Sequence, residues 1–208
     1  MNRLSLSPVI IGLSALILIV SSFNTAQASS PQDAENFVQT NAQAVISTLR
    51  DYRSGGTDLS AVKREFRQKI DVLADVDRVT NFVLGRYRRS ADPAALEEFR
   101  GVFREFAINA YERELANYGG QTLEVTGSVQ RGEGDYIVNS RIYGGPEGRE
   151  YDVKWRVLEH NGQYKVVDAE VLGIWLAQSQ RDQVTSIIGD HGGDVSAATR
   201  QLRNRMQG

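Results

Sequence analysis

The sequence predicts an α+β domain in which helices pack on one face of a four-stranded antiparallel sheet. Up to about residue 118, apolar residues recur every three or four positions, as in amphipathic helices. After Gly120 they recur at every second position in four separate runs, as in strands that bury one face. The chain has no internal repeat and no linker of the kind that separates domains, so we expect one domain over residues 29–208.

Three helices are expected before residue 85. Asp58 is a suitable N-cap for the second, and Gly85 ends the third, which begins near Asp75. The apolar positions of the first two helices are Phe37, Ala44, Val45 and Leu49, followed by Leu59, Val62, Phe66 and Ile70.

A longer fourth helix has the clearest boundaries. Asp92 supplies an N-cap, Pro93 suits the first turn, and Gly119 with Gly120 stops the helix. Its apolar stripe is rich in aromatic residues and consists of Leu96, Phe99, Phe103, Phe106, Ala110 and Leu115, broadened by Val102, Ala107 and Tyr111.

The four strand runs are joined by glycine-rich turns, of which Asn161-Gly162 is the strongest hairpin signal. Two helices are expected after the sheet, over residues 176–188 and 195–206. The alternating apolar residues of the strands are Leu123, Val125 and Val129; Tyr136, Val138 and Ile142; Tyr151, Val153, Trp155 and Val157; Tyr164 and Val166.

The N-terminus has the pattern of a secretory signal peptide. A basic start at Arg3 precedes the apolar run VIIGLSALILIV at residues 9–20, and Ala26-Gln27-Ala28 resembles a cleavage site. The apolar run is short for a membrane-spanning helix, which needs about 20 residues. We therefore expect residues 1–28 to be removed, with a retained membrane anchor as the alternative, and the remaining domain to reach the periplasm.

Composition excludes several classes of function. The chain has no cysteine and two histidines, which excludes a thiol nucleophile, disulfides and a cysteine- or histidine-rich metal centre. The formal net charge of −2 gives no electrostatic footprint for nucleic acid. The glycine clusters lack the spacing and lysine of a phosphate-binding loop. We expect no cofactor and no nucleic-acid partner.

Few residues suggest chemistry. The alternation of a strand places Asp168 on the same face as Tyr164 and Val166. A carboxylate that faces an apolar cavity there could act as a general base. The plainer interpretation is that Asp168 forms a hydrogen bond to the backbone or to an arginine. His160 and His191 lie in loops and are expected to be solvated.

A basic cluster, Arg86-Tyr87-Arg88-Arg89, follows the third helix. The plain interpretation is a solvated loop able to pair with Glu97 and Glu98. The functional alternative is that it meets anionic head groups or an acidic partner.

Several short motifs, in this order, resemble the MlaC/toluene-tolerance family of periplasmic lipid-binding proteins. The resemblance runs from about Pro31 to the end of the chain and rests on Leu84-Gly85-Arg86-Tyr87, Tyr164-Lys165-Val166-Val167-Asp168, Gly173-Ile174-x-Leu176, Gln180-Arg181 and Gly192-Gly193-Asp194. Trp175 stands where these proteins more often have serine, and Val184 where an aromatic residue is commoner. The last two motifs are at least as similar to a branch of the family that accompanies hopanoid biosynthesis as they are to the phospholipid shuttles.

The resemblance implies a cone of the NTF2-like or cystatin-like type with a lipid cavity. It also implies a carrier without catalytic activity, which binds phospholipid and moves it between an inner-membrane lipid transporter and an outer-membrane lipoprotein complex. The alternatives are a hopanoid carrier of the same family, a small-molecule enzyme on an NTF2-like fold with Asp168 as base, and an interaction module with a filled core.

The candidate cavity wall combines the aromatic residues of the long helix, expected to lie across the sheet, with one face of the strands. Large rings hold two layers apart. Trp175, with Leu176, is placed at the entrance. The proposed lipid-binding residues are Phe99, Phe103, Phe106, Tyr111, Val138, Ile142, Val153, Trp155, Val157, Val166 and Trp175. The alternative is that they form a filled core.

Overall fold

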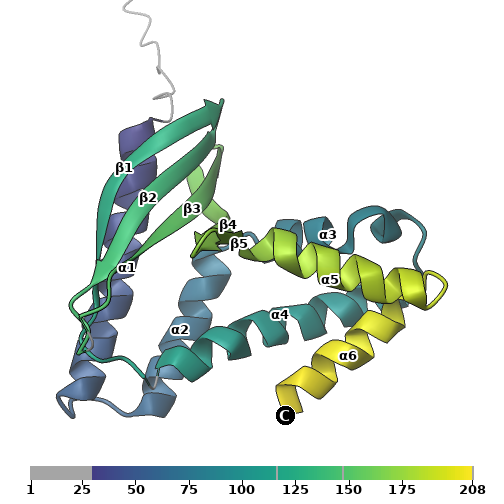
Figure 1. The fold of residues 1–208 in the computed structure, drawn as a ribbon, viewed down its shortest axis with the longest axis horizontal. Helices are drawn as coiled ribbons and strands as arrows, with labels where there is room; N and C mark the ends of the chain where they lie inside the picture. Colours follow the sequence, from purple (N-terminus) through teal and green to yellow (C-terminus); the bar gives the residue numbers. More distant parts are fainter. Residues whose placement is uncertain (1–29, 116, 147, 208) are drawn as a thin grey trace, which may run out of the picture.

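The computed structural model describes residues 30–115, 117–146 and 148–207, and it has the expected α+β architecture (Figure 1). Helices precede and follow one antiparallel sheet. The helical elements are α1 (Pro31–Arg53), α2 (Leu59–Leu73), α3 (Val76–Leu84), the 3₁₀ turn η1 (Gly85–Arg89), α4 (Pro93–Leu115), α5 (Leu176–Asp190) and α6 (Val195–Gln207). The strands are β1 (Thr122–Gly132), β2 (Asp135–Tyr143), β3 (Tyr151–His160), β4 (Gln163–Val171) and β5 (Ile174–Trp175).

Side-chain caps fix the starts of the helices near the positions predicted. Asp58 accepts a hydrogen bond from the Ala61 N–H at 2.8 Å, and Asp92 accepts one from the Ala94 N–H at 2.8 Å. Ser30 and Asp33 form a capping box at the start of α1. These caps satisfy N–H groups that a helix leaves without internal partners.

The sheet contains one more strand than expected. Its order is β1-β2-β3-β4-β5, with every neighbouring pair antiparallel. The extra strand is the two-residue β5, which pairs with the end of β4 through Glu170 and Val171. It is too short for a periodic sequence signal.

Because of two irregularities in the strand pairing, Val129 and Asp168 lie on the opposite face of the sheet from the one predicted. An extra residue between Val125 and Gly127 of β1 shifts the register, so Val129 lies opposite Ile137 and is 59% exposed instead of facing inward. A second shift in β4 places Asp168 opposite Arg156. The expectation that Asp168 shares a face with Tyr164 and Val166 is therefore wrong.

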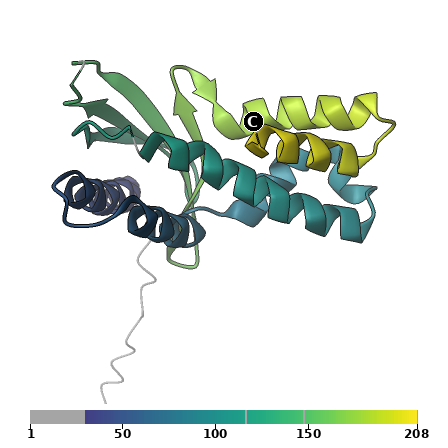
Figure 2. The same cartoon turned by 90° about the horizontal axis from the view of Figure 1, so that it is seen from below.

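The helix that lies across the sheet is α1 (Figures 1 and 2). Ala34 and Val38 of α1 pack with Tyr136, Val138 and Val157 in a buried cluster. This cluster defines the inner face of the sheet.

Side chains of α1 also form hydrogen bonds with backbone groups of the edge strand β1. The Val125 N–H donates to Gln39 Oε1 at 2.8 Å, and Gln43 Nε2 donates to the Leu123 carbonyl at 3.1 Å. The bulged strand is thereby held against α1.

The long helix α4 belongs instead to a separate helical half. Phe99 and Phe103 are buried with Leu84, Val184 and Leu202 of α3, α5 and α6. The two phenyl rings are stacked with their centroids 5.7 Å apart. The expectation that α4 lies across the sheet is wrong, because an aromatic stripe does not specify which apolar surface it will pack against.

Helix α2 joins the two halves. Val62 of α2 packs with Leu49 of α1 and Leu115 of α4. On another side of α2, Arg67 pairs with Glu105 at 2.7 Å and with Glu112 at 2.6 Å. Figure 2 shows α4 running from beside the sheet into the helical half. The sheet and the helical half thus have their own apolar cores and are joined by a partly ionic contact.

Candidate functional site

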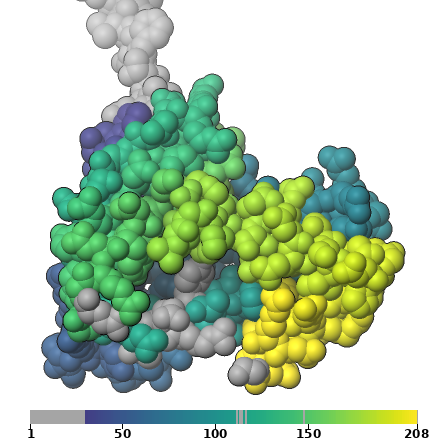
Figure 3. Space-filling model, viewed as in Figure 1, coloured from purple at the N-terminus to yellow at the C-terminus, as the bar shows by residue number. Residues whose placement is uncertain are grey.

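The surface is hollowed where the sheet meets the helical half (Figure 3). The opening lies between the green strands, the segment around β5 and the teal atoms of α4. Its position follows from the packing described above, since the inner face of the sheet is covered by α1 while α4 packs mainly with helices. The hollow therefore lies between the sheet and α4, which belong to two separate apolar cores.

The sheet residues of the predicted wall share the inner face. Tyr136, Val138, Ser140 and Ile142 of β2 lie opposite Val157, Trp155, Val153 and Tyr151 of β3. Among the predicted residues, Val138, Val153 and Val157 are buried, whereas Ile142, Trp155 and Val166 are half-buried. Trp155 and Val166 pack in part against the cluster of α1 and the sheet, whereas Ile142 does not belong to it. As half-buried residues, all three keep some apolar surface exposed.

Trp155 is fixed in place by hydrogen bonds. Its Nε1–H donates to Ser140 Oγ at 2.9 Å, and the Ser140 hydroxyl donates to the Val153 carbonyl at 3.0 Å. Ser140 is 1% exposed, so this chain satisfies polar groups that would otherwise be costly to bury. The indole ring is held on the inner face with its one polar atom occupied, which leaves the rest of the ring as an apolar surface.

The helix residues of the predicted wall are placed differently. Phe99 is 0% and Phe103 4% exposed, both inside the helical cluster, and the half-buried Phe106 packs against the same cluster. The side chain of Tyr111 lies outside the described residues. Trp175 is half-buried at the end of β5. The structure thus does not bring the predicted helix and sheet residues together in one cluster.

Asp168 caps helix α5 from the neighbouring strand. Its Oδ1 accepts hydrogen bonds from the N–H groups of Ala169 and Ala177, each at 2.8 Å. Trp175, the N-cap residue of α5, has no side-chain cap of its own. The plainer of the two sequence interpretations, a backbone hydrogen bond, is confirmed, and the carboxylate positions α5 against the sheet.

Removal of this cap is expected to destabilise the fold. Asp168→Ala leaves the first N–H groups of α5 without an acceptor, and we expect a loss of about 1–2 kcal/mol in the free energy of unfolding. Urea denaturation of both proteins measures the difference. Asp168→Asn, which keeps one acceptor oxygen, should lose less; equal losses would argue against capping as the role of this residue.

The Asp168 carboxyl also gives stability a pH dependence. Burial raises its pKa above the ordinary value, while the backbone N–H donors and Arg156 act in the opposite direction. The folded protein therefore binds this proton at a higher pH than the unfolded chain does. The resulting stabilisation is complete below the unfolded pKa and is lost as the pH rises through the folded pKa.

Asp168→Asn cannot titrate at this position and provides the comparison. On lowering the pH through the acidic range down to the unfolded pKa, wild type is expected to gain stability relative to this variant. Urea denaturation at a series of pH values measures the gap, and a gap that moves in favour of the variant would contradict the assignment.

The two histidines are exposed, as expected. His160 lies at the end of β3, and His191 follows α5, where its Nδ1 is 2.8 Å from the Ile187 carbonyl oxygen. Neither has a carboxylate partner among the hydrogen bonds of the described residues.

The basic cluster forms the 3₁₀ turn η1. Tyr87 is buried, and its hydroxyl accepts a hydrogen bond from Arg86 at 2.8 Å, whereas Arg88 and Arg89 are exposed. The acids expected to pair with this cluster have other partners: Glu97 pairs with Arg100 at 3.4 Å, and Glu98 with Arg203 at 2.7 Å.

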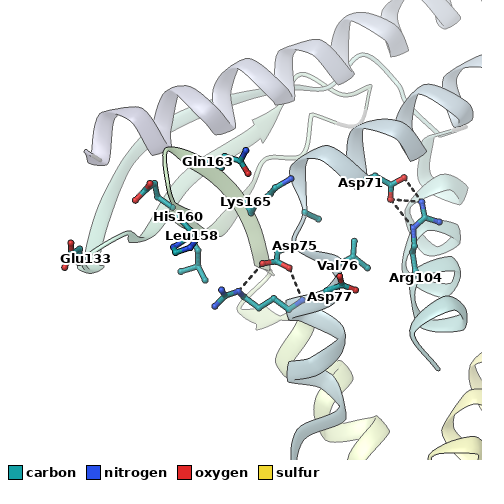
Figure 4. A pocket seen from close by; sticks show the side chains of 13 residues that line it. Asp71, Asp75, Val76, Asp77, Arg104, Glu133, Leu158, His160, Gln163 and Lys165 are labelled. Carbon is teal, nitrogen blue, oxygen red and sulfur yellow. Dashed lines mark hydrogen bonds and ion pairs between the residues drawn. The ribbon is translucent and has the colours of Figure 1, made fainter. Parts of the chain in front are cut away.

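A second depression, of about 660 Å³, lies between the start of α3 and the ends of the sheet hairpins (Figure 4). Its walls carry ion pairs of Asp71 with Arg104 at 2.6 Å and of Asp75 with Arg78 at 3.1 Å. Glu133, Glu159 and Lys165 add further charges. These charged walls do not suit hydrocarbon, in contrast to the apolar inner face of the sheet beside the hollow.

Sequence reasoning missed the contribution of α1 to the inner face. Phe37 packs against the sheet cluster, and its ring lies 5.9 Å from that of Tyr164, measured between centroids. The spacing of Ala34 and Val38 at four residues is a sequence signal for this buried face of α1.

In the described part of the chain, no helix is long and apolar enough to cross a membrane. The predicted signal peptide, residues 1–28, lies outside the described residues.

Comparison with known proteins connects this geometry to a family. The chain is similar to the intermembrane phospholipid transport system binding protein MlaC of Haemophilus influenzae, with 26% identity over 116 residues that span 54% of each chain, so the match covers about half of that relative. Its fold is similar to a solved structure of the phospholipid-binding protein from Ralstonia solanacearum in complex with a phospholipid. That match has a TM-score of 0.73 and 26% identity, and it covers 84% of this chain and 97% of the other. The family model for MlaC protein matches residues 39–204. The chain therefore belongs to the MlaC family.

Proposed function

We propose that this protein is a periplasmic lipid carrier that holds the acyl chains of a phospholipid in the hollow beside the inner sheet face. The observation that carries the proposal is the fold shared, over nearly the whole of the other chain, with a phospholipid-binding protein in complex with phospholipid. The half-buried apolar residues Ile142, Trp155 and Val166 are suitable wall residues.

Hydrocarbon transfer explains why such a wall is needed. A phospholipid with two chains contains about thirty methylenes, and at about 0.8 kcal/mol each their exposure to water costs roughly 25 kcal/mol. A carrier crossing an aqueous compartment must cover most of that surface with apolar side chains. The inner face supplies them, and the hydrogen bond of Trp155 to Ser140 removes the indole N–H as a polar obstacle.

The proposed route runs between the inner and outer membranes. The signal-like residues 1–28 direct the chain to the periplasm and are removed. The proposed partners are a lipid transporter of the inner membrane and a lipoprotein complex of the outer membrane, because the protein is a member of the MlaC family and a relative is named as the binding protein of an intermembrane phospholipid transport system.

Catalysis is not part of the proposal. Asp168, the residue considered as a general base, accepts one hydrogen bond from the Ala169 N–H of its own strand and one from the Ala177 N–H at the start of α5, which explains its burial without a reaction.

Phospholipid is preferred over hopanoid as the ligand. Two of the residues that suggested the hopanoid branch have structural roles: Arg181 stacks on Phe82 with 4.7 Å between its guanidinium and the ring centroid, and Asp194 accepts a hydrogen bond from the Ser196 N–H at 2.9 Å. Val184 is 1% exposed inside the helical cluster. Residues that hold helices together do not discriminate between lipids.

Native mass spectrometry of protein purified from the periplasm tests the function. We expect a population heavier by the mass of a phospholipid, which organic extraction then identifies. A polycyclic lipid in its place would support the hopanoid alternative. Protein that is free of lipid and takes up none from detergent-dispersed phospholipid would refute the carrier and favour an interaction module.

A further inference from the structure

The hairpin between β4 and β5 carries two apolar side chains into solvent. Leu172 is 78% exposed and Ile174 is 57% exposed. Leu172 has the highest exposed fraction among the large apolar residues of the described part of the chain. The fold itself gains little from these side chains, because exposed apolar surface contributes nothing to the core.

The backbone conformation at residue 172 is one that leucine rarely adopts. Leu172 has φ +52° and Gly173 φ +82°, a left-handed pair typical of a two-residue hairpin turn. The β3–β4 turn has the same pair of values, +52° and +78°, but uses Asn161 and Gly162. Asparagine tolerates this conformation well, whereas leucine is strained in it. The β3–β4 turn therefore has a residue that favours this conformation, whereas the β4–β5 turn has an apolar residue that does not.

The hairpin lies at the edge of the hollow. Figure 3 shows the segment around β5 bordering the opening, and Figure 2 shows the hairpin projecting from the junction of the two halves. The carboxylate of Glu170, two residues before the tip, pairs with Lys154 at 2.8 Å. An apolar tip therefore stands beside the entrance of the proposed lipid site.

We propose that the 172–174 tip inserts Leu172 and Ile174 into the hydrocarbon border of a lipid bilayer, so that the opening faces the membrane while a lipid enters or leaves. This inference rests on the proposed carrier function. A bilayer is the favoured occupant because the tip is convex and small. Two side chains at a two-residue turn cover far less than the roughly 800 Å² per partner of a stable protein interface, whereas lipid can surround a projecting tip.

Two substitutions separate this role from a structural one. Leu172→Asn places the residue favoured by the turn at the tip, as at Asn161, and is expected to raise the midpoint of thermal unfolding. Ile174→Thr keeps the β-branched shape for strand β5. Val129→Thr makes the same kind of change at a 59% exposed residue on the outer face of β1 and serves as the control.

Flotation with vesicles of phosphatidylethanolamine and phosphatidylglycerol measures insertion. We expect wild type to float with the vesicles and the doubly substituted Leu172→Asn/Ile174→Thr protein to float about tenfold less, with little effect of salt because the contact is apolar. Val129→Thr should behave as wild type. Equal flotation of the double variant, or no flotation of wild type, would overturn the proposal; the second result points to a protein partner at the tip.

Loading from detergent-dispersed phospholipid separates this inference from the carrier function, since that route needs no bilayer. The double variant is expected to load as much lipid as wild type from detergent and to extract it about tenfold more slowly from vesicles. If wild type loads from neither source, the carrier function fails. If it loads from both and the variant extracts from vesicles equally fast, the membrane-inserting tip alone fails.

Discussion

Phe99→Ala is expected to lower the free energy of unfolding by about 3–5 kcal/mol, the range for removing a buried phenyl ring from a packed core. Phe99 is 0% exposed, stacks on Phe103 and lies in the cluster that holds α3, α4, α5 and α6 together. Against a total stability of about 5–15 kcal/mol, this loss removes a large part of what keeps the domain folded. Chemical denaturation followed by circular dichroism measures it.

Phe99→Leu distinguishes packing from lipid contact at this position. Leucine refills most of the volume, so we expect a loss of about 1 kcal/mol and the same lipid content per folded protein as in wild type. A folded Phe99→Leu protein with a strongly reduced lipid content would instead place Phe99 in the lipid wall, as the sequence-based prediction has it.

Ile142→Glu is expected to reduce the lipid content of the folded protein at least about tenfold. Ile142 is half-buried on the inner sheet face, opposite Tyr151 of β3 and Leu123 of β1. A carboxylate beside an acyl chain loses hydration without gaining a partner, and a penalty of only about 1.4 kcal/mol already changes affinity tenfold. Quantitative lipid extraction, normalised to folded protein, measures the effect.

The matched control places the same charge on the other face of the sheet. Val129→Glu adds a carboxylate at a residue that is 59% exposed on the outer face, so its lipid content is expected to equal that of wild type. Equal losses in both variants would mean that charge on the sheet acts indirectly, and equal retention in both would remove Ile142 from the lipid wall.

Much of the fold could be predicted because its signals are local. The caps Asp58 and Asp92 lie beside the helices they start, and the Asn161-Gly162 pair encodes its own hairpin. The alternation of apolar residues in β2 and β3 predicts their inner faces correctly, because neither strand is bulged against the other. Each of these features depends on a few neighbouring residues.

What could not be predicted depends on contacts distant in sequence. The bulge in β1 turns Val129 outward because of how β1 pairs with β2. Helix α4 has an apolar stripe that fits a sheet or other helices equally well, and only the assembled fold shows that Phe99 and Phe103 pack with α5 and α6. The family resemblance supplied the expectation of a lipid site, whereas the division between wall residues and core residues required the packing.

The most direct test of the account is photocrosslinking with a phospholipid that carries a photoreactive group in its acyl chain. After loading and irradiation, tryptic peptides are analysed for adducts. If the acyl chains lie against the inner sheet face, adducts are expected in β2 and β3, at inner-face residues such as Ile142 and Trp155, and none at the buried Phe99. Adducts confined to the outer sheet face or to the helical cluster, with the inner face unlabelled, would contradict it.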